Sequence, residues 1–212
     1  MKFEYFLDEL ESIRKVDAIG ERAHELIFPE ISKFRKEALL KNPEPRLSAV
    51  AAIFFPKNGE TNFLLIERQT YEGVHSGQIG FPGGKKELFD ITLEATARRE
   101  TEEEVGIGAD EPTLIRTLSE VYIPPSGFLV QPYLFTLDYE PKLMLDPREV
   151  QSALIMPVER LMDDAVLENG SVPTGRGAAV RTSYFHHEGK KIWGATAMML
   201  AELKLLLNQI KT

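Results

Sequence analysis

Apolar residues in the first forty positions recur at helical spacing, and polar residues fill the positions between them. The first apolar series comprises Phe3, Phe6, Leu7, Leu10 and Ile13. The second series runs from residue 26 to residue 39 and is interrupted at Pro29. Apolar residues three and four apart predict amphipathic helices, and a proline inside the second series predicts a break there. The run from Asn42 to Pro45 ends the helical pattern. We therefore predict an N-terminal helical extension over residues 1–45.

From Arg46 onward, the pattern changes to that of β-strands separated by turns. Residues 49–55 form a continuous apolar run and residues 62–68 are predicted as a second strand, with a Lys-Asn-Gly-Glu turn between them, so we predict a β-hairpin. An amphipathic helix is predicted over residues 196–211. Before it, we predict strands or short apolar segments at residues 113–121, 130–139, 149–156, 183–187 and 190–193. Strands on both sides of a central helix, with a terminal helix, predict an α/β sandwich over residues 46–212.

Composition narrows the classes of function that this 212-residue chain can serve. Hydrophobic residues make up 43% and charged residues 27%, which is ordinary for a globular protein with a buried core. The net charge is −8 and no long Lys/Arg block occurs, so binding to nucleic acid or to an anionic membrane is disfavoured. The absence of cysteine excludes disulfides, thiolate catalysis and cysteine zinc sites. The N-terminus lacks a signal-peptide pattern and no apolar run reaches membrane-spanning length, so we expect a cytoplasmic protein.

The densest local feature is an acidic helix that follows a glycine-rich turn. The turn reads Phe-Pro-Gly-Gly at residues 81–84, and the helix ends in the run Arg-Glu-Thr-Glu-Glu-Glu-Val-Gly at residues 99–106. At about 100° per residue, Glu100, Glu103 and Glu104 share one arc roughly 100° wide. Like charges at this spacing destabilise a helix, and carboxylates in its last turn oppose the helix dipole. A hard divalent cation offsets this repulsion, because Mg²⁺ takes oxygen ligands and bridges carboxylates to phosphates.

This stretch resembles the signature of the Nudix hydrolases, which has the pattern Gly…Glu…Arg-Glu-x-x-Glu-Glu-x-Gly. The matching positions are Gly84, Arg99, Glu100, Glu103, Glu104 and Gly106. The signature usually has a Glu eight positions before the Arg, where this chain has Ile91, and the stretch from the first Gly to the Arg is one residue longer here. Asp90 is the nearest acid, so we expect it to take that glutamate's role and to pair with Arg99. Without the resemblance, the same carboxylates would be read as a solvated acidic helix face.

The resemblance implies an α/β/α sandwich with a mixed sheet that hydrolyses a pyrophosphate bond with Mg²⁺ or Mn²⁺. Such phosphoryl transfer needs cations on the phosphate oxygens and a positioned water. We expect Glu100 and Glu104 to bind the metal, and Glu103 to bind a second ion or to hold the water. Arg99 either orients these glutamates or forms a surface ion pair. The predicted catalytic set is Glu103, Arg99 and Glu100, and the predicted metal set is Glu100, Glu104 and Glu103.

Four further residues are candidates for substrate binding. Gly83 and Gly84 permit close backbone approach, unless they only form a tight turn. Arg68 ends a predicted strand that faces these glycines, and a guanidinium can bind phosphate in a bidentate manner. Lys85 adds a point charge. Ala97 shares the acidic face of the helix, where its small side chain leaves room for phosphate.

The longer spacing is similar to the coenzyme A pyrophosphatase branch, which has a second motif upstream of the signature. Ile66 replaces a Thr of this motif, Gln69 replaces a Ser, and Gly73 stands where a second Arg is expected. The positions that agree with the motif are Leu64, Leu65, Arg68, Gly77 and Phe81. Trp193 precedes the last helix, and we assign it to the core rather than to base stacking.

We therefore predict a hydrolase whose substrate is a nucleoside diphosphate-linked small molecule, with coenzyme A or a derivative as the first choice. One alternative is the same chemistry on ADP-ribose or another nucleoside diphosphate derivative, and another is a non-catalytic ligand sensor. The glutamate cluster argues against a sensor, because a pure binder does not need it. We expect the helical extension to pack on the main domain or on a second subunit, which leaves a homodimer open.

Overall fold

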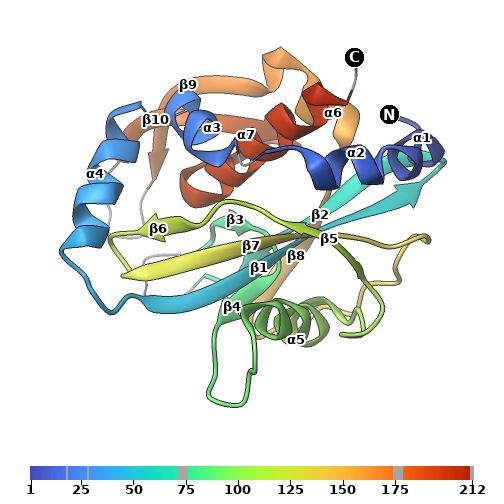
Figure 1. The fold of residues 1–212 in the computed structure, drawn as a ribbon, viewed down its shortest axis with the longest axis horizontal. Helices are drawn as coiled ribbons and strands as arrows, with labels where there is room; N and C mark the ends of the chain where they lie inside the picture. Colours follow the sequence, from blue (N-terminus) through green and yellow to red (C-terminus); the bar gives the residue numbers. More distant parts are fainter. Residues whose placement is uncertain (18, 28, 71–75, 174–178, 211–212) are drawn as a thin grey trace.

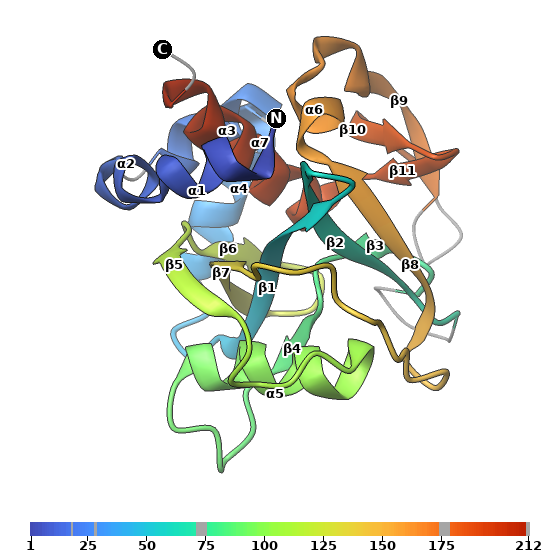
Figure 2. The same ribbon diagram turned by 90° about the vertical axis from the view of Figure 1, so that its right-hand side faces the viewer.

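The structure of the protein is a computed structural model that describes residues 1–210 except 18, 28, 71–75 and 174–178. Gly73, the position where the sequence lacks an expected arginine, therefore lies outside the described residues. The described chain folds around a mixed sheet of eight strands with helices on both faces (Figures 1 and 2). This mixed α/β architecture confirms the fold class predicted from the sequence.

The large sheet consists of β1 (Arg46–Lys57), β2 (Glu60–Arg68), β3 (Ile79–Gly80), β4 (Gly83–Lys85), β5 (Thr113–Thr117), β6 (Val121–Ile123), β7 (Phe128–Thr136) and β8 (Val150–Pro157). Its main path is β3-β2-β1-β7-β5, and β4, β6 and β8 pair with β1, β7 and β2 respectively. β1 and β2 form the predicted hairpin, whereas β7 lies parallel to β1. The central strands read as nearly continuous apolar runs because helices cover both faces of the sheet.

Helix α5 (Leu93–Val105) covers one face of the large sheet, and α7 (Gly194–Gln209) lies on the other (Figure 2). Successive side chains of a strand point to opposite faces, so Ile53 of β1 joins the core beneath α5, whereas Phe54 joins the core beneath α7. The layers are therefore helix, sheet and helix. Among the described residues, no helix combines the length and the apolar composition needed to span a membrane.

The N-terminal extension packs on the same face as α7. Its helices are α1 (Phe3–Asp8), α2 (Leu10–Lys15), α3 (Gly20–Ile27) and α4 (Pro29–Leu40). The fully buried ring of Phe6 stacks on Phe54 with 5.3 Å between centroids, and Phe54 stacks on Phe63 at the same distance. Burying one such side chain stabilises the fold by about 1.5–3 kcal/mol. The extension thus shares the core of the main domain within one chain.

Two predicted elements are interrupted in the structure. The helical series over residues 3–13 forms two helices, because Glu9 departs from helical geometry with φ −89° and ψ 0°. The strand predicted over residues 113–121 stops at the end of β5, and the N–H of Ser119 donates to the Glu202 carboxylate at 3.0 Å instead of to a neighbouring strand. A side chain of α7 thus satisfies a backbone donor that a longer strand would have paired.

A smaller sheet includes a strand that the sequence pattern does not reveal. Its strands are β9 (Leu167–Pro173), β10 (Ala179–His187) and β11 (Lys190–Ile192), in the order β11-β10-β9. β10 and β11, which contain most of the segments predicted at residues 183–187 and 190–193, pair as a hairpin. β9 reads Leu-Glu-Asn-Gly-Ser-Val-Pro, which has no apolar alternation, so only its pairing with β10 identifies it as a strand. Helix α6 (Val158–Met162) and a 3-10 turn, η1 (Asp164–Val166), connect β8 to this sheet.

Candidate functional site

Helix α5 has defined ends that fix which of its residues face the sheet. The Thr92 hydroxyl accepts the N–H of Ala95 at 3.1 Å as an N-cap, and Gly106 ends the helix in the left-handed region with φ 75°. The resulting register buries both Ala97 and Glu104. Ala97, expected beside phosphate on the acidic face, instead packs in the core between α5 and the sheet.

Gly83 and Gly84 let β4 lie close to β1 and to α5. A Cβ on Gly83 would lie 2.3 Å from the carbonyl oxygen of Ala49, and the φ of 148° at Gly83 is one that L side chains rarely adopt. A Cβ on Gly84 would lie 2.4 Å from the carboxylate of Glu100. Backbone atoms of β1 therefore require glycine at position 83, whereas a side chain at position 84 would displace the Glu100 carboxylate. The segment predicted as a turn is a short strand paired with β1.

Three carboxylates converge where α5 approaches the end of β2 and the start of β8. Glu100 and Glu104 lie one turn apart on α5, and Glu149 directly precedes β8; one oxygen of each lies within 4.8 Å of the others. The N–H of Gln69 donates to the carbonyl of Glu149 at 2.8 Å, which ties this segment to the end of β2. We call Glu100, Glu104 and Glu149 the carboxylate group. Convergent carboxylate oxygens are the ligands that hard divalent cations require.

Glu104 is the most buried member of the carboxylate group, with 1% of its surface exposed. Its Oε2 accepts the N–H of Gly83 at 2.8 Å, whereas its Oε1 accepts no hydrogen bond from the described residues and lies 3.5 Å from Nη1 of Arg68. Burial raises the pKa of Glu104 from 4.5 to about 7 and also raises the pKa of Glu100. Buried carboxylates with an unpartnered oxygen are costly unless a cation neutralises them. The donor set therefore fits a divalent metal ion.

Arg99 forms ion pairs with Asp90, Glu100 and Glu103 at the solvent-facing side of the carboxylate group. Its Nε and Nη2 donate to the two oxygens of Asp90, each at 3.0 Å, which confirms the predicted pair. The same guanidinium lies 2.8 Å from Oε1 of Glu100 and donates from Nη1 to Oε2 of Glu103 at 3.0 Å. Asp90 is 5% exposed and also accepts the hydroxyl of Thr96 at 3.0 Å. These donors, the guanidinium above all, lower the pKa of Asp90 to about 2.

Glu103 and Lys85 lie at the rim of the site rather than inside it. The Glu103 side chain is 59% exposed, and its carboxylate is not part of the carboxylate group. The arc shared by the three helix glutamates is roughly 100° wide, so Glu104 lies at its buried edge and Glu103 at its solvent edge. Lys85 is exposed, with its Nζ 3.3 Å from Glu87.

Glu149 is the member of the carboxylate group that the sequence reading missed. It lies outside the signature, and no spacing rule connects it to α5. The structure places it there because β8 pairs with β2, with Val150 opposite Arg68. The sequence could have indicated Glu149 only as an acidic residue directly before a strand that pairs with β2. That indication requires the pairing of β8 with β2 to be known.

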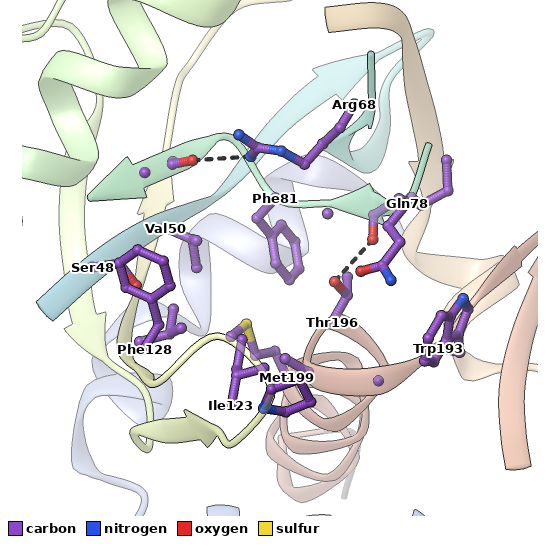
Figure 3. A pocket seen from close by; sticks show the side chains of 18 of the residues that line it. Ser48, Val50, Arg68, Gln78, Phe81, Ile123, Phe128, Trp193, Thr196 and Met199 are labelled. Atoms are coloured by element: carbon purple, nitrogen blue, oxygen red, sulfur yellow. Dashed lines mark hydrogen bonds between the residues drawn. The ribbon is translucent and has the colours of Figure 1, made fainter. Parts of the chain in front are cut away.

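Arg68 lies between the carboxylate group and a cavity of about 550 Å³. Its Nη1 donates to the carbonyl of Gly83 at 3.3 Å, and Figure 3 shows the Arg68 side chain extending from β2 toward β4. The labelled side chains in Figure 3 surround the space below Arg68. The cavity walls are mostly apolar or aromatic and include Val50, Phe81, Ile123, Phe128, Trp193 and Met199. The size suits a nucleotide-sized organic group.

The sequence analysis assigned Trp193 to the core, and the structure corrects this placement. The residue is half-buried and lines the cavity near Thr196 and Gln78 (Figure 3). The hydroxyl of Thr196 donates to the carbonyl of Ile79 at 2.9 Å, which attaches the start of α7 to β3. The tryptophan therefore stands at a wall of the cavity because it immediately precedes α7.

Comparison with known proteins finds relatives over most of the chain. The family model described as NUDIX domain matches residues 45–173. Nudix hydrolase 3 of Caenorhabditis elegans is 26% identical over 207 residues, covering 83% of this chain and 86% of the relative. An uncharacterized Nudix hydrolase, NudL, of Photorhabdus laumondii is 29% identical over 174 residues, covering 80% of this chain and 92% of the relative. The crystal structure of a Nudix hydrolase from M. smegmatis, RenU, has a TM-score of 0.53 at 17% identity, covering 78% of this chain and 88% of that one.

Proposed function

This chain belongs to the Nudix hydrolase family and is an enzyme of the pyrophosphatase class, and from this premise we propose that it cleaves the diphosphate bond of coenzyme A or of a coenzyme A derivative. The observation that carries the proposal is the carboxylate group beside a cavity whose walls are mostly apolar. One side of that cavity is suited to bind a metal-associated diphosphate, and the rest of it is suited to bind an organic group.

Glu100, Glu104 and Glu149 are the residues that would hold Mg²⁺ or Mn²⁺, because both ions favour carboxylate oxygens. When bound, such an ion neutralises phosphate oxygens and activates water. Arg99 orients the Glu100 carboxylate through their 2.8 Å contact, and Asp90 anchors Arg99 from the other side. These contacts keep the ligand oxygen in place without a change of side-chain conformation.

Glu103 is the candidate for holding the attacking water. Its carboxylate is exposed at the rim of the site and contacts the same guanidinium as Glu100. A carboxylate in this position is open to solvent, whereas the buried Glu104 is not. Arg99 thus couples the orientation of Glu100 and Glu103.

Arg68 and Lys85 are the cations that would bind the diphosphate from the protein side. Arg68 is 28% exposed, and its guanidinium has more N–H donors than the Gly83 carbonyl and Glu104 engage. Charge-assisted bonds from a guanidinium to phosphate are short and directional. Gly84 adds a backbone that lies against Glu100, so the diphosphate can approach without a side chain in the way.

The choice of coenzyme A is supported by where its motif residues lie. Arg68 and Phe81 both match the upstream motif, and both line the cavity beside the carboxylate group. The half-buried rings of Phe128 and Trp193 are the aromatic parts of the wall that could contact a nucleobase. We therefore assign the nucleoside half of the substrate to this cavity.

A substrate panel tests the proposal. Purified protein is assayed with Mg²⁺ and with Mn²⁺ on coenzyme A, ADP-ribose and NADH, with products separated by chromatography. We expect the highest kcat/KM with coenzyme A, products of diphosphate cleavage, and loss of turnover on chelation. Brisk cleavage of ADP-ribose with none of coenzyme A would overturn the substrate, and binding without cleavage of any diphosphate would indicate a sensor.

A further inference from the structure

Arg35 brings a cation from the N-terminal extension to the proposed substrate cavity. The residue lies on α4 and is one of the residues that line the cavity. Its guanidinium hydrogen-bonds to the sulfur of Met198, and a thioether is a weak acceptor. Among the residues that the structure describes, Arg35 forms no ion pair with a carboxylate. The positive charge therefore has no counterion within the described chain.

Two other partly buried arginines, Arg116 and Arg99, are satisfied by groups of the chain itself. Arg116 donates from Nη1 to the carbonyls of Ile13 and Val16 at 2.8 and 2.7 Å, and Arg99 pairs with Asp90. Arg35 differs because burial is the cause that lowers its pKa, to about 10, so the side chain stays charged at neutral pH. A charge held away from water without a partner is unfavourable. An anion from outside the chain would supply the missing partner.

Arg35 and Arg68 lie on different sides of the cavity. Arg68 contacts Gly83 of β4 and Glu104 of α5, the helix that lies below the large sheet in Figure 2. Arg35 contacts Met198 of α7, on the opposite face of the sheet, and also lines a second hollow between α3, α4 and β6. The buried His24 in that hollow has its pKa lowered to about 4, chiefly by burial, so it stays neutral and adds no competing charge. The cavity thus has Arg68 and Lys85 at the diphosphate side and Arg35 at its far side.

We propose that Arg35 binds a second phosphate, carried on the nucleoside half of the substrate and separate from the diphosphate that is cleaved. The inference rests on the proposed function, in that the cavity takes the nucleoside half. Arg35 then favours substrates with an additional ribose phosphate, such as the 3′-phosphate of coenzyme A, over substrates that lack one. The sequence has glycine at position 73, where the related motif has a cation. In the proposed subsite, Arg35 supplies a positive charge to the ribose phosphate from α4.

The test compares two substrates that differ by one phosphate. Steady-state kinetics are measured with coenzyme A and with 3′-dephospho-coenzyme A for the wild type, Arg35→Gln and Arg35→Lys. We expect the wild type to favour coenzyme A at least about tenfold in kcat/KM, mainly through KM. Arg35→Gln should bring the two substrates to near parity by weakening only coenzyme A, and Arg35→Lys should restore part of the preference. An equal loss on both substrates, or no loss on either, would overturn the inference.

A binding experiment separates this subsite from the proposed reaction. Adenosine 3′,5′-bisphosphate and adenosine 5′-monophosphate are added to the full chain, and the shift in melting temperature is recorded. We expect the bisphosphate to stabilise the wild type more than the monophosphate does, and Arg35→Gln to lose that difference. The exposed Arg22→Gln on α3 is the matched control and should behave as the wild type. If coenzyme A is not cleaved but the bisphosphate difference is present, the proposed reaction fails and the subsite stands; equal shifts in the wild type would reject the subsite.

Discussion

Replacing Glu104 with glutamine should change activity and metal-free stability in opposite directions. Glu104 is buried at 1% exposure, and its Oε2 accepts the N–H of Gly83 at 2.8 Å. The amide oxygen of glutamine can keep that hydrogen bond, because the two side chains have nearly the same shape. The substitution therefore removes one negative charge from the carboxylate group, together with the 3.5 Å contact between Oε1 and Arg68.

The size of the stability effect follows from the burial of this carboxylate. Burial raises the pKa of Glu104 from 4.5 to about 7, and a shift of that size corresponds to about 3 kcal/mol at about 1.4 kcal/mol per unit. At pH 8 without metal, Glu104→Gln should therefore raise the free energy of unfolding by up to about 3 kcal/mol. Activity should fall at least about a hundredfold, or about 2.7 kcal/mol of barrier, because a ligand charge is lost.

Urea unfolding at pH 8, with chelator and then with Mn²⁺, measures the first effect, and chromatographic measurement of the two products of diphosphate cleavage from coenzyme A measures the second. Mn²⁺ should stabilise the wild type and leave Glu104→Gln nearly unchanged, so the order of stability reverses on adding metal. Glu102→Gln on the exposed side of α5 is the matched control and should follow the wild type in both assays. Equal metal stabilisation of Glu104→Gln, or turnover like that of the wild type, would refute the assignment of this carboxylate as a ligand.

Three further changes test other parts of the site. The pKa of Asp90 lies at about 2, below its usual 3.8, because of hydrogen bonds from Arg99 above all. These bonds contribute about 2 kcal/mol of stability above pH 4 that is lost as the pH falls toward 2. Urea unfolding from pH 7 to 3 should show about half of this loss in the wild type and none of it in Asp90→Asn. Glu149→Gln should weaken Mn²⁺ binding at least about tenfold in a calorimetric titration, with wild-type stability because the residue is exposed; unchanged affinity would remove it from the carboxylate group. Gly84→Ala should keep the fold but lower kcat/KM at least about tenfold, because its Cβ would displace the Glu100 carboxylate 2.4 Å away; wild-type kinetics would contradict this geometry.

Local order in the sequence was enough to predict the acidic helix and the first hairpin. Both depend on residues that are near one another along the chain, so side-chain periodicity and turn residues are sufficient to place them. The Asp90–Arg99 pair was expected from the resemblance to the Nudix signature. The glycines at positions 83 and 84 were also visible as a pattern. The reason for them was not, because the atoms that a Cβ would meet belong to Ala49 of β1 and Glu100 of α5.

Packing between distant elements decided which charged groups meet. Helical spacing put Glu103 in the metal set, but the seating of α5 on the sheet turned it to the rim, and the pairing of β8 with β2 brought Glu149 in. The N-terminal extension was predicted as helical, yet only its packing against α7 placed Arg35 at the cavity. Periodicity describes the spacing of side chains along one element, whereas burial exists only after elements meet. For that reason the raised pKa of Glu104 and the uncompensated charge of Arg35 are properties of the tertiary structure alone.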